Sequence, residues 1–539
     1  MLFYFLCIIF VAKMFIQRIH KKTKNKIYTY VYLVENYREN GKIKHRLVSN
    51  LSNWPDELVE NFDKLLKGKS VTRVEDLSLS VGKSFGAIKA ISEIAKRLGI
   101  KQALGSSRQG KMALFQIAGR IITQGSRNYL ANSWKNLQAV EDVFNLKDFT
   151  HNNLYDNLNW LAQNQDEIEQ KIFNHRSRNQ SLKTVYLYDV TSSYLEGDKN
   201  ELAKYGYNRD KKKGKKQIVI GLLTDSEGYP VSVEVFKGNT HDTQTVSSQL
   251  AKLKERFGVE RVVFVGDKGM VKSGQIEEIT SDKFKWNYLT TITKEQIRKL
   301  IKEEVFQLDL FAEKLVEVKQ DSTRYILRRN PERAAALQEN RKSKIERVKA
   351  KVAEQNTYLS QHTKAQPQVA LRKIQEHIAR LNLKNIIKTD ISERTIHLSI
   401  DEHAQEKAEE LDGCYVVKTD VPPEQLATQK VHDRYKDLAK VEFAFRTFKT
   451  TMEEVRPVFV RKEENTRGHV FVVMLAYMII KYITDSFPEN KYNRKYIFES
   501  LDKINYAQYT FEGKTINIAP KNLLPDQQKI IETLKIKLA

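Results

Sequence analysis

The amino-acid sequence predicts an α/β fold in which a mixed sheet is flanked by helices. Five short apolar runs of strand length follow one another between residues 184 and 293. Residues 58–182 and 430–485 instead place apolar residues three and four positions apart, which is the period of an amphipathic helix. Of the 539 residues, 41% are hydrophobic and 29% are charged, a globular composition for about three or four domains.

The N-terminal region is expected to hold a small β element followed by helices. Residues 1–13 are largely apolar but too few to span a bilayer, which needs about 20 residues. We interpret them as a doubtful extension, with translation starting at Met14. The runs IYTYVYLVENYR and KIKHRLVSNL alternate in strand fashion around the turn ENGK, so residues 14–57 are assigned to the β element. Residues 58–182 form the helical region.

The five apolar runs predict the element order β-β-β-α-β-(α)-β across residues 183–293. The first three are VYLYD, KKQIVIGLLTD and YPVSVEVFKG, and the turn SEGY joins the last two as a hairpin. The segment HDTQTVSSQLAKLKERFG predicts a helix, which leads to the fourth and fifth runs, RVVFVGD and FKWNYLTTIT. A helical crossover returns the chain in parallel, so the first and fourth strands are expected to lie side by side.

The remaining chain divides into three segments. Residues 294–428 are interpreted as a mostly β insertion with one charged helical stretch, RNPERAAALQENRKSKIERVKAKVAEQNTYL, whose charges fit a solvated face. Residues 429–485 are helical, and the run VFVVMLAYMII within them is too short to span a membrane and predicts a core helix. The pattern of residues 486–539 assigns no structure, and a role in dimerisation is left open.

Charge and cysteine content limit the classes of function. The 91 Lys and Arg exceed the 67 Asp and Glu, and a net charge of +24 attracts polyanions, above all nucleic acid. The alternative is a basic composition that reflects an AT-rich genome. Two cysteines exclude a disulfide framework or a cysteine-based zinc site and fit a reducing, cytoplasmic setting.

Two aspartates follow apolar strands and are candidates for one site. Asp189 lies at the tip of the first strand, and Asp267 follows the fourth strand between two glycines, Gly266 and Gly269. Adjacent first and fourth strands would bring both carboxylates together, and two such carboxylates repel each other. A divalent metal removes this repulsion, and Mg²⁺ prefers oxygen ligands. A capping role for a single aspartate is the alternative.

A third carboxylate is predicted on the helix DRYKDLAKVEFAFRTFKT. Tyr435, Glu442 and Lys449 are spaced by seven and therefore share one face of this helix. The alternative is an exposed pair between Glu442 and Arg446, worth a few tenths of a kcal/mol.

These residues together resemble a DDE transposase of the insertion-sequence-four family. That family has two aspartates on RNase H-like strands, a mostly β insertion and a helix reading Y-x2-R-x3-E-x6-K. Tyr435, Glu442 and Lys449 match this helix in register, whereas Leu438 stands in the arginine position, for which Arg446 is a hypothetical substitute. The strings GNTHDTQT, GDKGM and RPVFVRKEENTRGH also resemble family segments, and the resemblance covers about residues 14–485.

The resemblance implies cut-and-paste DNA transposition with two Mg²⁺ or Mn²⁺ ions. Asp189 would bridge both ions, and Asp267 and Glu442 would each complete one, while Tyr435 and Lys449 would hold a phosphate. Further DNA contacts are expected from Arg446 and from the KKKGKK stretch, which is otherwise a solvated turn: Lys211, Lys212, Lys213, Lys215 and Lys216.

The resemblance also implies partners and a location. Double-stranded DNA is the expected partner, with residues 58–182 recognising transposon ends and a homodimer pairing two ends in a synaptic complex. The protein is expected in the cytoplasm at the nucleoid, with no membrane partner.

Other assignments remain open at this stage. Asp242 is interpreted as a helix-start carboxylate and Trp286 as a core residue. A nuclease or resolvase on the same fold, or an inactive DNA-binding relic, are alternative functions. A glycosidase with a carboxylate pair is disfavoured by the +24 charge and by only 4 tryptophans.

Overall fold

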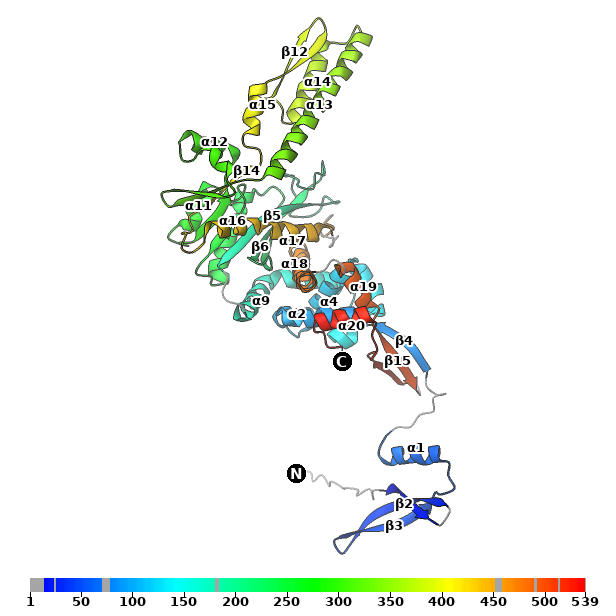
Figure 1. Ribbon diagram of the computed structural model, residues 1–539. Helices are drawn as coiled ribbons and strands as arrows, with labels where there is room; N and C mark the ends of the chain where they lie inside the picture. The colour runs from blue at the N-terminus through cyan, green and yellow to red at the C-terminus, as the bar shows by residue number, and fades with distance from the viewer. Residues whose placement is uncertain are drawn as a thin grey trace. The chain divides into compact units, whose positions relative to one another are not determined.

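The computed structural model describes most of the chain in two compact units. The described residues are 14–23, 26–69, 78–179, 184–450, 458–488, 492–511 and 514–538. One unit comprises residues 1–82 and 505–521, and the other comprises residues 83–504 and 522–539. The doubtful extension at residues 1–13 lies outside the described residues. Figure 1 shows both units, with labels on many of their helices and strands.

The first unit contains the predicted small β element as a three-stranded antiparallel sheet with a helix on one face. Its elements are β1 (Met14–Lys22), β2 (Ile27–Glu39), β3 (Lys42–Asn50) and α1 (Asp56–Leu66). Asn40 and Gly41 have positive φ angles of 52° and 76°, as a tight two-residue hairpin turn requires. A second sheet of this unit consists of β4 (Ser78–Ser84), β15 (Asn505–Phe511) and β16 (Lys514–Ile518).

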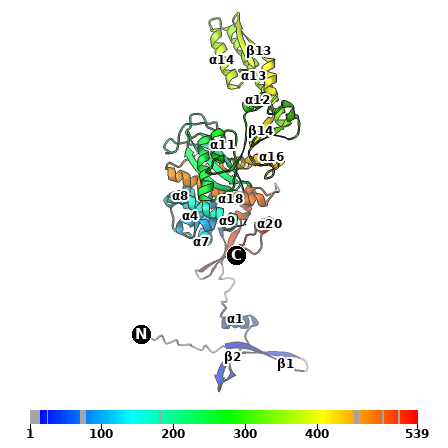
Figure 2. The same cartoon turned by 90° about the vertical axis from the view of Figure 1, so that its left-hand side faces the viewer.

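The second unit begins with the helices that the sequence period predicts. Its longer helices in this region are α2 (Gly86–Arg97), α4 (Arg108–Ile122), α8 (His151–Gln163) and α9 (Gln165–Asn179). Three of them, α2, α4 and α8, pack against α18 (Glu463–Ser486), and Figure 2 shows α4 and α8 next to α18. The tail assigned no structure from the sequence contributes α19 (Arg494–Asp502) and α20 (Pro525–Thr533).

Helix α18 is the core helix that the sequence predicts. By length and composition it could cross a membrane, but 78% of its apolar window is buried inside the fold. A Cβ atom at Gly468 would lie only 2.0 Å from the carbonyl oxygen of Leu158 in α8. Only glycine therefore permits the close approach of these two helices.

An eight-stranded mixed sheet forms the centre of the second unit, in the order β10-β11-β14-β9-β8-β5-β6-β7. The five predicted strands are β5 (Val185–Tyr194), β6 (Gln217–Asp225), β7 (Pro230–Lys237), β8 (Val263–Val265) and β9 (Asn287–Thr291). Strand β5 pairs antiparallel with β6 and parallel with β8, so the first and fourth predicted strands lie side by side as expected. The arrangement is the mixed sheet flanked by helices that was predicted for an RNase H-like core.

Segment 294–428 was expected to be mostly β, but it contains more helix than strand. Three of its strands extend the main sheet: β10 (Val316–Gln320), β11 (Thr323–Arg329) and β14 (Cys414–Thr419). Its helices are α12 (Lys294–Lys302), α13 (Pro331–Gln361), α14 (Pro367–Arg380) and α15 (Glu402–Glu409). Helix dominates because α13 is rich in Ala, Lys, Glu, Gln and Arg, which have high helix propensity.

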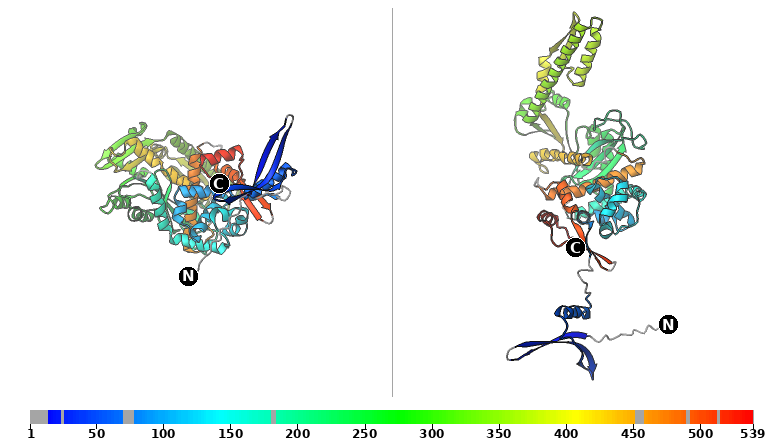
Figure 3. Two further views of the ribbon diagram at one scale, coloured as in Figure 1. Left: turned by 90° about the horizontal axis from the view of Figure 1, so that it is seen from below. Right: turned by 90° about the vertical axis from the view of Figure 1, so that its right-hand side faces the viewer.

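The helices α13 and α14 belong to a segment, residues 330–413, that leaves the sheet at the end of β11 and returns at the start of β14. This segment is called the excursion. Arg329 of β11 pairs with Cys414 of β14, so the chain leaves and re-enters the sheet at adjacent positions. The excursion includes the small hairpin of β12 (Ile387–Ser392) and β13 (Thr395–Ile400), and its apolar side chains form a core of their own. The right-hand view of Figure 3 shows this yellow-green helix pair beyond the green strands of the sheet.

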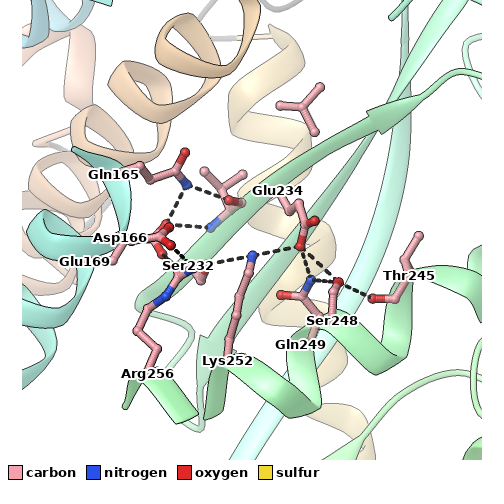
Figure 4. Close-up of polar contacts among 12 residues, drawn as sticks. Gln165, Asp166, Glu169, Ser232, Glu234, Thr245, Ser248, Gln249, Lys252 and Arg256 are labelled. Atoms are coloured by element: carbon pink, nitrogen blue, oxygen red, sulfur yellow. Dashed lines mark hydrogen bonds and ion pairs between the residues drawn. The ribbon is translucent and has the colours of Figure 1, made fainter. Parts of the chain in front are cut away.

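A buried polar network connects α9 with strand β7 of the sheet (Figure 4). The carboxylate of Glu169 in α9 is fully buried, accepts a hydrogen bond from the backbone N of Val233 at 3.2 Å and pairs with Arg256 at 2.8 Å. Lys252 pairs with Glu234 of β7 at 2.7 Å. Burial raises the pKa of Glu169, and the charges of Lys252 and Arg256 oppose this effect. Such a compensated buried carboxylate favours one arrangement of helix and sheet.

Candidate active site

The parallel pairing of β5 and β8 places the two candidate aspartates at neighbouring positions. Leu187 of β5 is paired with Val265 of β8, and Asp189 and Asp267 each lie two residues beyond this pair. Neighbouring strands are about 4.8 Å apart, so the register brings both carboxylates to one place on the sheet.

Asp189 lies inside its strand rather than at the tip, where the sequence placed it. Strand β5 continues to Tyr194, because residues beyond Leu187 still pair with β6, in which Leu222 faces Asp189. The shorter neighbouring strand β8 ends at Val265, two residues before Asp267. The side chain of Asp189 is half-buried, and its Oδ1 accepts a hydrogen bond from the backbone N of Val190 at 2.7 Å.

Burial is the main cause that raises the pKa of Asp189 to about 7. The Val190 hydrogen bond opposes this shift, the negative charges of Asp267 and Glu442 add to it, and the positive charge of Arg209 again opposes it. The three carboxylates predicted from the sequence therefore interact electrostatically in the fold.

Asp267 is exposed and held by the turn that follows β8. Its Oδ1 accepts hydrogen bonds from the backbone N atoms of Gly269 at 2.9 Å and Met270 at 3.0 Å. These bonds fix the carboxylate and leave the second oxygen, Oδ2, for another ligand. A Cβ at Gly266 would come within 2.7 Å of the Val271 side chain, so glycine also allows the turn to close.

Glu442 and Tyr435 come from two consecutive helices, not from one uninterrupted helix as expected. Helix α16 (Thr428–Lys436) ends before Asp437, and α17 (Leu438–Thr450) begins after it. The Asp437 carboxylate pairs with Arg434 at 2.9 Å and with Lys440 at 2.8 Å, one cation from each helix. Helix α17 packs against β5 and β6 (Figure 1). Glu442 on this helix is exposed to solvent.

Tyr435 and Lys449 each contact a residue outside their own helices. The Tyr435 hydroxyl forms a hydrogen bond with the Thr291 hydroxyl at 3.0 Å, at the end of β9. Burial raises the pKa of Tyr435, and Asp267 and Glu442 contribute to this increase, so the tyrosine lies near both carboxylates. Lys449 pairs with Asp210 at 2.8 Å, with only 11% and 2% of the two side chains exposed.

Leu438 and Arg446 occupy opposite environments on α17. Leu438, in the position where the family signature has arginine, is buried in the fold. Arg446 is exposed on the helix.

The predicted lysine stretch lies in the loop between β5 and β6. Lys211, Lys212 and Lys213 are exposed, and Gly214 with a φ of 71° makes the turn. Lys215 pairs with Glu196 at 2.7 Å. The Lys216 ammonium lies 3.5 Å from the carbonyl oxygen of Asp198. The same loop holds Asp210, the partner of Lys449.

Two other sequence interpretations agree with the structure. Asp242 is the first residue of the short 3₁₀ helix Asp242–Thr245, where it was expected to start a helix. Trp286 is buried and donates its indole N–H to the Glu260 carbonyl oxygen at 2.9 Å, as a core residue.

Arg209 and Asp210 were not singled out from the sequence, yet both reach the site. Arg209 pairs with Asp242 at 2.6 Å and lowers the pKa of Asp189. A cavity of about 640 Å³ opens beside this pair, lined among others by Tyr205, Tyr207, His241 and Lys272. The dipeptide Arg209-Asp210 immediately before the lysine stretch, in YGYNRDKKK, was the available signal.

The carboxylates fit a divalent cation by their chemistry. Mg²⁺ and Mn²⁺ bind carboxylate oxygens, and Mg²⁺ keeps several waters, so two carboxylates per ion are enough. Burial is the main cause of the raised pKa of Asp189, and the negative charges of Asp267 and Glu442, which add to it, are charges that a cation would compensate. Among the described residues, no group of three or more His, Cys, Asp or Glu side chains is close enough to hold one ion together.

Comparisons with known proteins place the chain among transposases. A family model described as "Transposase DDE domain" matches residues 180–479, and a model of the IS1634 family transposase N-terminal domain matches residues 16–76. No curated protein matches the chain. The chain is similar to one in the cryo-EM structure of a piggyBac transposase synaptic complex with hairpin DNA, with 10% identity, 77% of each chain covered and a TM-score of 0.34.

Proposed function

Because the chain belongs to the transposase DDE domain family, we propose that it moves an insertion sequence by cutting and rejoining DNA. Water would attack the phosphodiester at the element's end and free a 3′-OH. That hydroxyl would then attack a phosphodiester of the target DNA. Both steps exchange one P–O bond for another, and no covalent protein intermediate is needed.

The single observation that carries the proposal is the position of the three carboxylates. The β5–β8 register sets Asp189 beside Asp267, and the charge of Glu442 acts on Asp189. Asp189 would share two Mg²⁺ or Mn²⁺ ions, one with Asp267 and one with Glu442. Bound there, the ions would activate the attacking oxygen and stabilise the leaving oxygen.

The protein's own groups would orient the DNA at this site. Tyr435 is near Asp267 and Glu442, and its hydroxyl is oriented by Thr291. Lys449 is oriented by Asp210, and an ammonium held this way can bind a phosphate as a point charge. Arg446 and the lysines of the β5–β6 loop would extend this basic surface along the DNA backbone.

The finer family assignment is part of the proposal. The register of Tyr435, Glu442 and Lys449 supports membership of the insertion-sequence-four family. Leu438 departs from its signature and is buried, so any phosphate contact of the family's arginine would have to come from Arg446. The proposal also includes a homodimer that pairs two transposon ends and action at the nucleoid of a prokaryotic cell. Residues 58–182 would recognise the DNA ends.

A gel assay with Mg²⁺ and the DNA ends that flank the gene for this chain tests the proposed function. We expect the wild type to cleave at the ends and to join the cleaved ends to a target plasmid. Asp189→Ala and Glu442→Ala should both abolish cleavage. Asp282→Ala, which removes a fully exposed carboxylate, is the matched control and should cleave like the wild type.

The outcomes separate the rival functions. Cleavage without joining would support a nuclease or resolvase, and binding without cleavage in the wild type would support an inactive relic. Cleavage that survives in both carboxylate variants would show that the active site lies elsewhere.

A further inference from the structure

Helix α17, which carries Glu442, begins at a polar contact that joins three parts of the second unit. The Lys440 ammonium pairs with the Asp437 carboxylate at 2.8 Å and donates a hydrogen bond to the carbonyl oxygen of Ser226 at 2.7 Å. Ser226 belongs to the turn between β6 and β7. The contact therefore connects the first turn of α17 both with the junction to α16 and with the sheet.

The β6–β7 turn is held in place by the Asp225 carboxylate. Its Oδ1 accepts hydrogen bonds from the backbone N atoms of Glu227 at 2.9 Å and Tyr229 at 3.0 Å. Its Oδ2 pairs with Arg176 of α9 at 2.8 Å. An aspartate that binds the backbone of its own turn in this way fixes the turn conformation. Lys440 thus binds a carbonyl group whose position is already set.

Gly228 allows this turn to lie close against α17. Its φ angle is 83°, a left-handed conformation that glycine adopts easily. A Cβ atom at Gly228 would lie only 2.8 Å from the Cβ of Lys440, a rigid part of that side chain. Any larger residue at this position would push the start of α17 away from the turn.

The turn lies near the carboxylates of the candidate active site. Asp225 ends β6, three residues after Leu222, which is paired with Asp189. Three residues of a strand span about 10 Å. Lys440 and Glu442 are two positions apart, so their side chains leave α17 in directions that differ by about 200°. A contact that fixes Lys440 therefore fixes the rotation of α17 and the direction in which Glu442 points.

Helix α16 is held by other strands than α17. It contacts β9, β11 and β14, whereas α17 contacts β5 and β6. Asp437 lies between the two helices, and its two carboxylate oxygens pair with different cations, Arg434 of α16 and Lys440 of α17. Because Asp189 is on β5, the position of Glu442 relative to Asp189 depends on how α17 itself is held.

We propose that Lys440 is a positioning residue for the metal site. It holds the start of α17 against the β6–β7 turn and thereby directs Glu442 toward Asp189. Asp437 orients the Lys440 ammonium, and in this role Lys440 contacts neither DNA nor a metal ion. The inference rests on the proposed function, in which Asp189 and Glu442 share an ion.

Thermal melting of the full chain over a range of Mn²⁺ concentrations, without DNA, tests this role. An ion that binds the folded chain raises its stability with the logarithm of the ion concentration. Lys440→Met keeps most of the side-chain stem and removes the ammonium. Losing a residue that orients a metal ligand weakens metal binding by about 10–100-fold, so Lys440→Met should need at least about tenfold more Mn²⁺ for the same rise in melting temperature.

Two further variants show whether the ammonium contact is the cause. Lys440→Arg can still donate to Ser226 and pair with Asp437, and it should restore most of the Mn²⁺ affinity. Lys299→Met removes a lysine that pairs with Glu303 along its own helix, α12, and is the control for the lost charge. It should leave the Mn²⁺ dependence of melting unchanged.

A pair of glycine variants tests the same contact from the side of the turn. Gly228→Ala and Gly258→Ala both place a side chain at a left-handed backbone position, and both should lower the melting temperature without metal. A Cβ at Gly258 meets no atom within 4 Å, whereas a Cβ at Gly228 meets Lys440. Only Gly228→Ala should therefore also weaken the response to Mn²⁺.

The reference for all these variants is Glu442→Ala, which removes the ligand itself. If Glu442→Ala weakens the Mn²⁺ response and Lys440→Met does not, the positioning role is wrong and the carboxylate site stands. If the wild type shows no Mn²⁺ response, the metal site and the positioning role both fail. An equal loss in Lys299→Met would show that only net charge matters. A higher KM for the terminal DNA with an unchanged Mn²⁺ response would make Lys440 a DNA contact instead.

Discussion

At the scale of single residues, Asp189 couples protonation to stability. Its pKa is raised to about 7, above the usual value of about 3.9. Between these two pH values the folded chain binds the proton more tightly than the unfolded chain does. The free energy of unfolding therefore decreases as pH rises from about 4 to 7 through this residue.

Replacing Asp189 with asparagine should stabilise the metal-free protein at pH 8 but not at pH 5. The amide cannot ionise, so the cost of a buried charge disappears where the wild type is ionised. After allowance for solvent screening, we expect a gain on the order of 1–3 kcal/mol at pH 8. Melting of both proteins in EDTA at the two pH values measures it. Asp282→Asn is the control, and an equal gain at both pH values would contradict the electrostatic origin.

The pair of Lys449 and Asp210 allows stability and activity to be separated. Lys449→Met removes an ammonium that pairs with the Asp210 carboxylate, of which only 2% is exposed, and this should cost about 3 kcal/mol. Adding Asp210→Asn should restore most of that loss in thermal melting. If Lys449 holds a phosphate, the restored double variant should still cleave DNA poorly. Full activity in the double variant would limit Lys449 to a structural role.

The residues missed from the sequence share one property. Asp210 and Lys449 are 239 positions apart, and Arg209 and Asp242 are 33 apart. No local period connects such positions, whereas Asp189 and Asp267 could be linked because each follows an apolar run and the run order implied adjacent strands. The placement of residues on periodic elements was thus open to prediction, and the placement of their loop partners was not.

At the scale of elements, strand period and crossover direction predicted β5 to β9, but not the full width of the sheet. Strands β10, β11 and β14 were assigned to an insertion, although they extend the same sheet. Pairing between β11 and β14 spans the whole α13–α14 excursion, and a local pattern carries no information about such a distant partner. The division at Asp437 between the helices that carry Tyr435 and Glu442 could not be predicted either, because both halves have helical period.

The contact between α18 and α8 predicts that one added methyl group, in Gly468→Ala, lowers the stability of the fold. Gly468→Ala places a Cβ against the backbone of Leu158, which cannot move without shifting α8. We expect destabilisation of about 1–3 kcal/mol or more, measured as a lower melting temperature. Gly274→Ala in α11 (Ser273–Thr280) is the matched control, because a Cβ there meets no atom within 4 Å. Alanine should be neutral or slightly stabilising in that helix. Equal melting temperatures of Gly468→Ala and Gly274→Ala would argue against the tight contact between α18 and α8.

At the scale of the whole molecule, the net charge of +24 predicts steep salt dependence of DNA binding. A protein that contacts six to ten phosphates loses about 10³–10⁵ in affinity between 50 and 200 mM salt. Anisotropy titrations of the full chain with a random duplex should show a loss in this range. A nearly constant affinity would mean that the surplus charge does not face DNA.

The excursion between β11 and β14 should be removable without loss of the sheet. Replacing residues 330–413 with Asn-Gly would join the paired residues Arg329 and Cys414 by a hairpin turn. The excursion has its own apolar core, so the sheet loses mainly the edge contacts of Leu411 and Asp412. We expect a soluble protein with less helix by circular dichroism and a cooperative melt. Loss of cooperative melting would show that the excursion supports the sheet.

The same geometry makes the end of β11 a suitable position for inserting a foreign domain by protein engineering. Paired residues on adjacent antiparallel strands have Cα atoms only about 5 Å apart. An inserted domain whose N- and C-termini lie close together can therefore replace the excursion. A programmable DNA reader grafted at this position would be carried by the catalytic unit at a fixed attachment point. The choice of target sequence could then be altered without editing any residue of the carboxylate site.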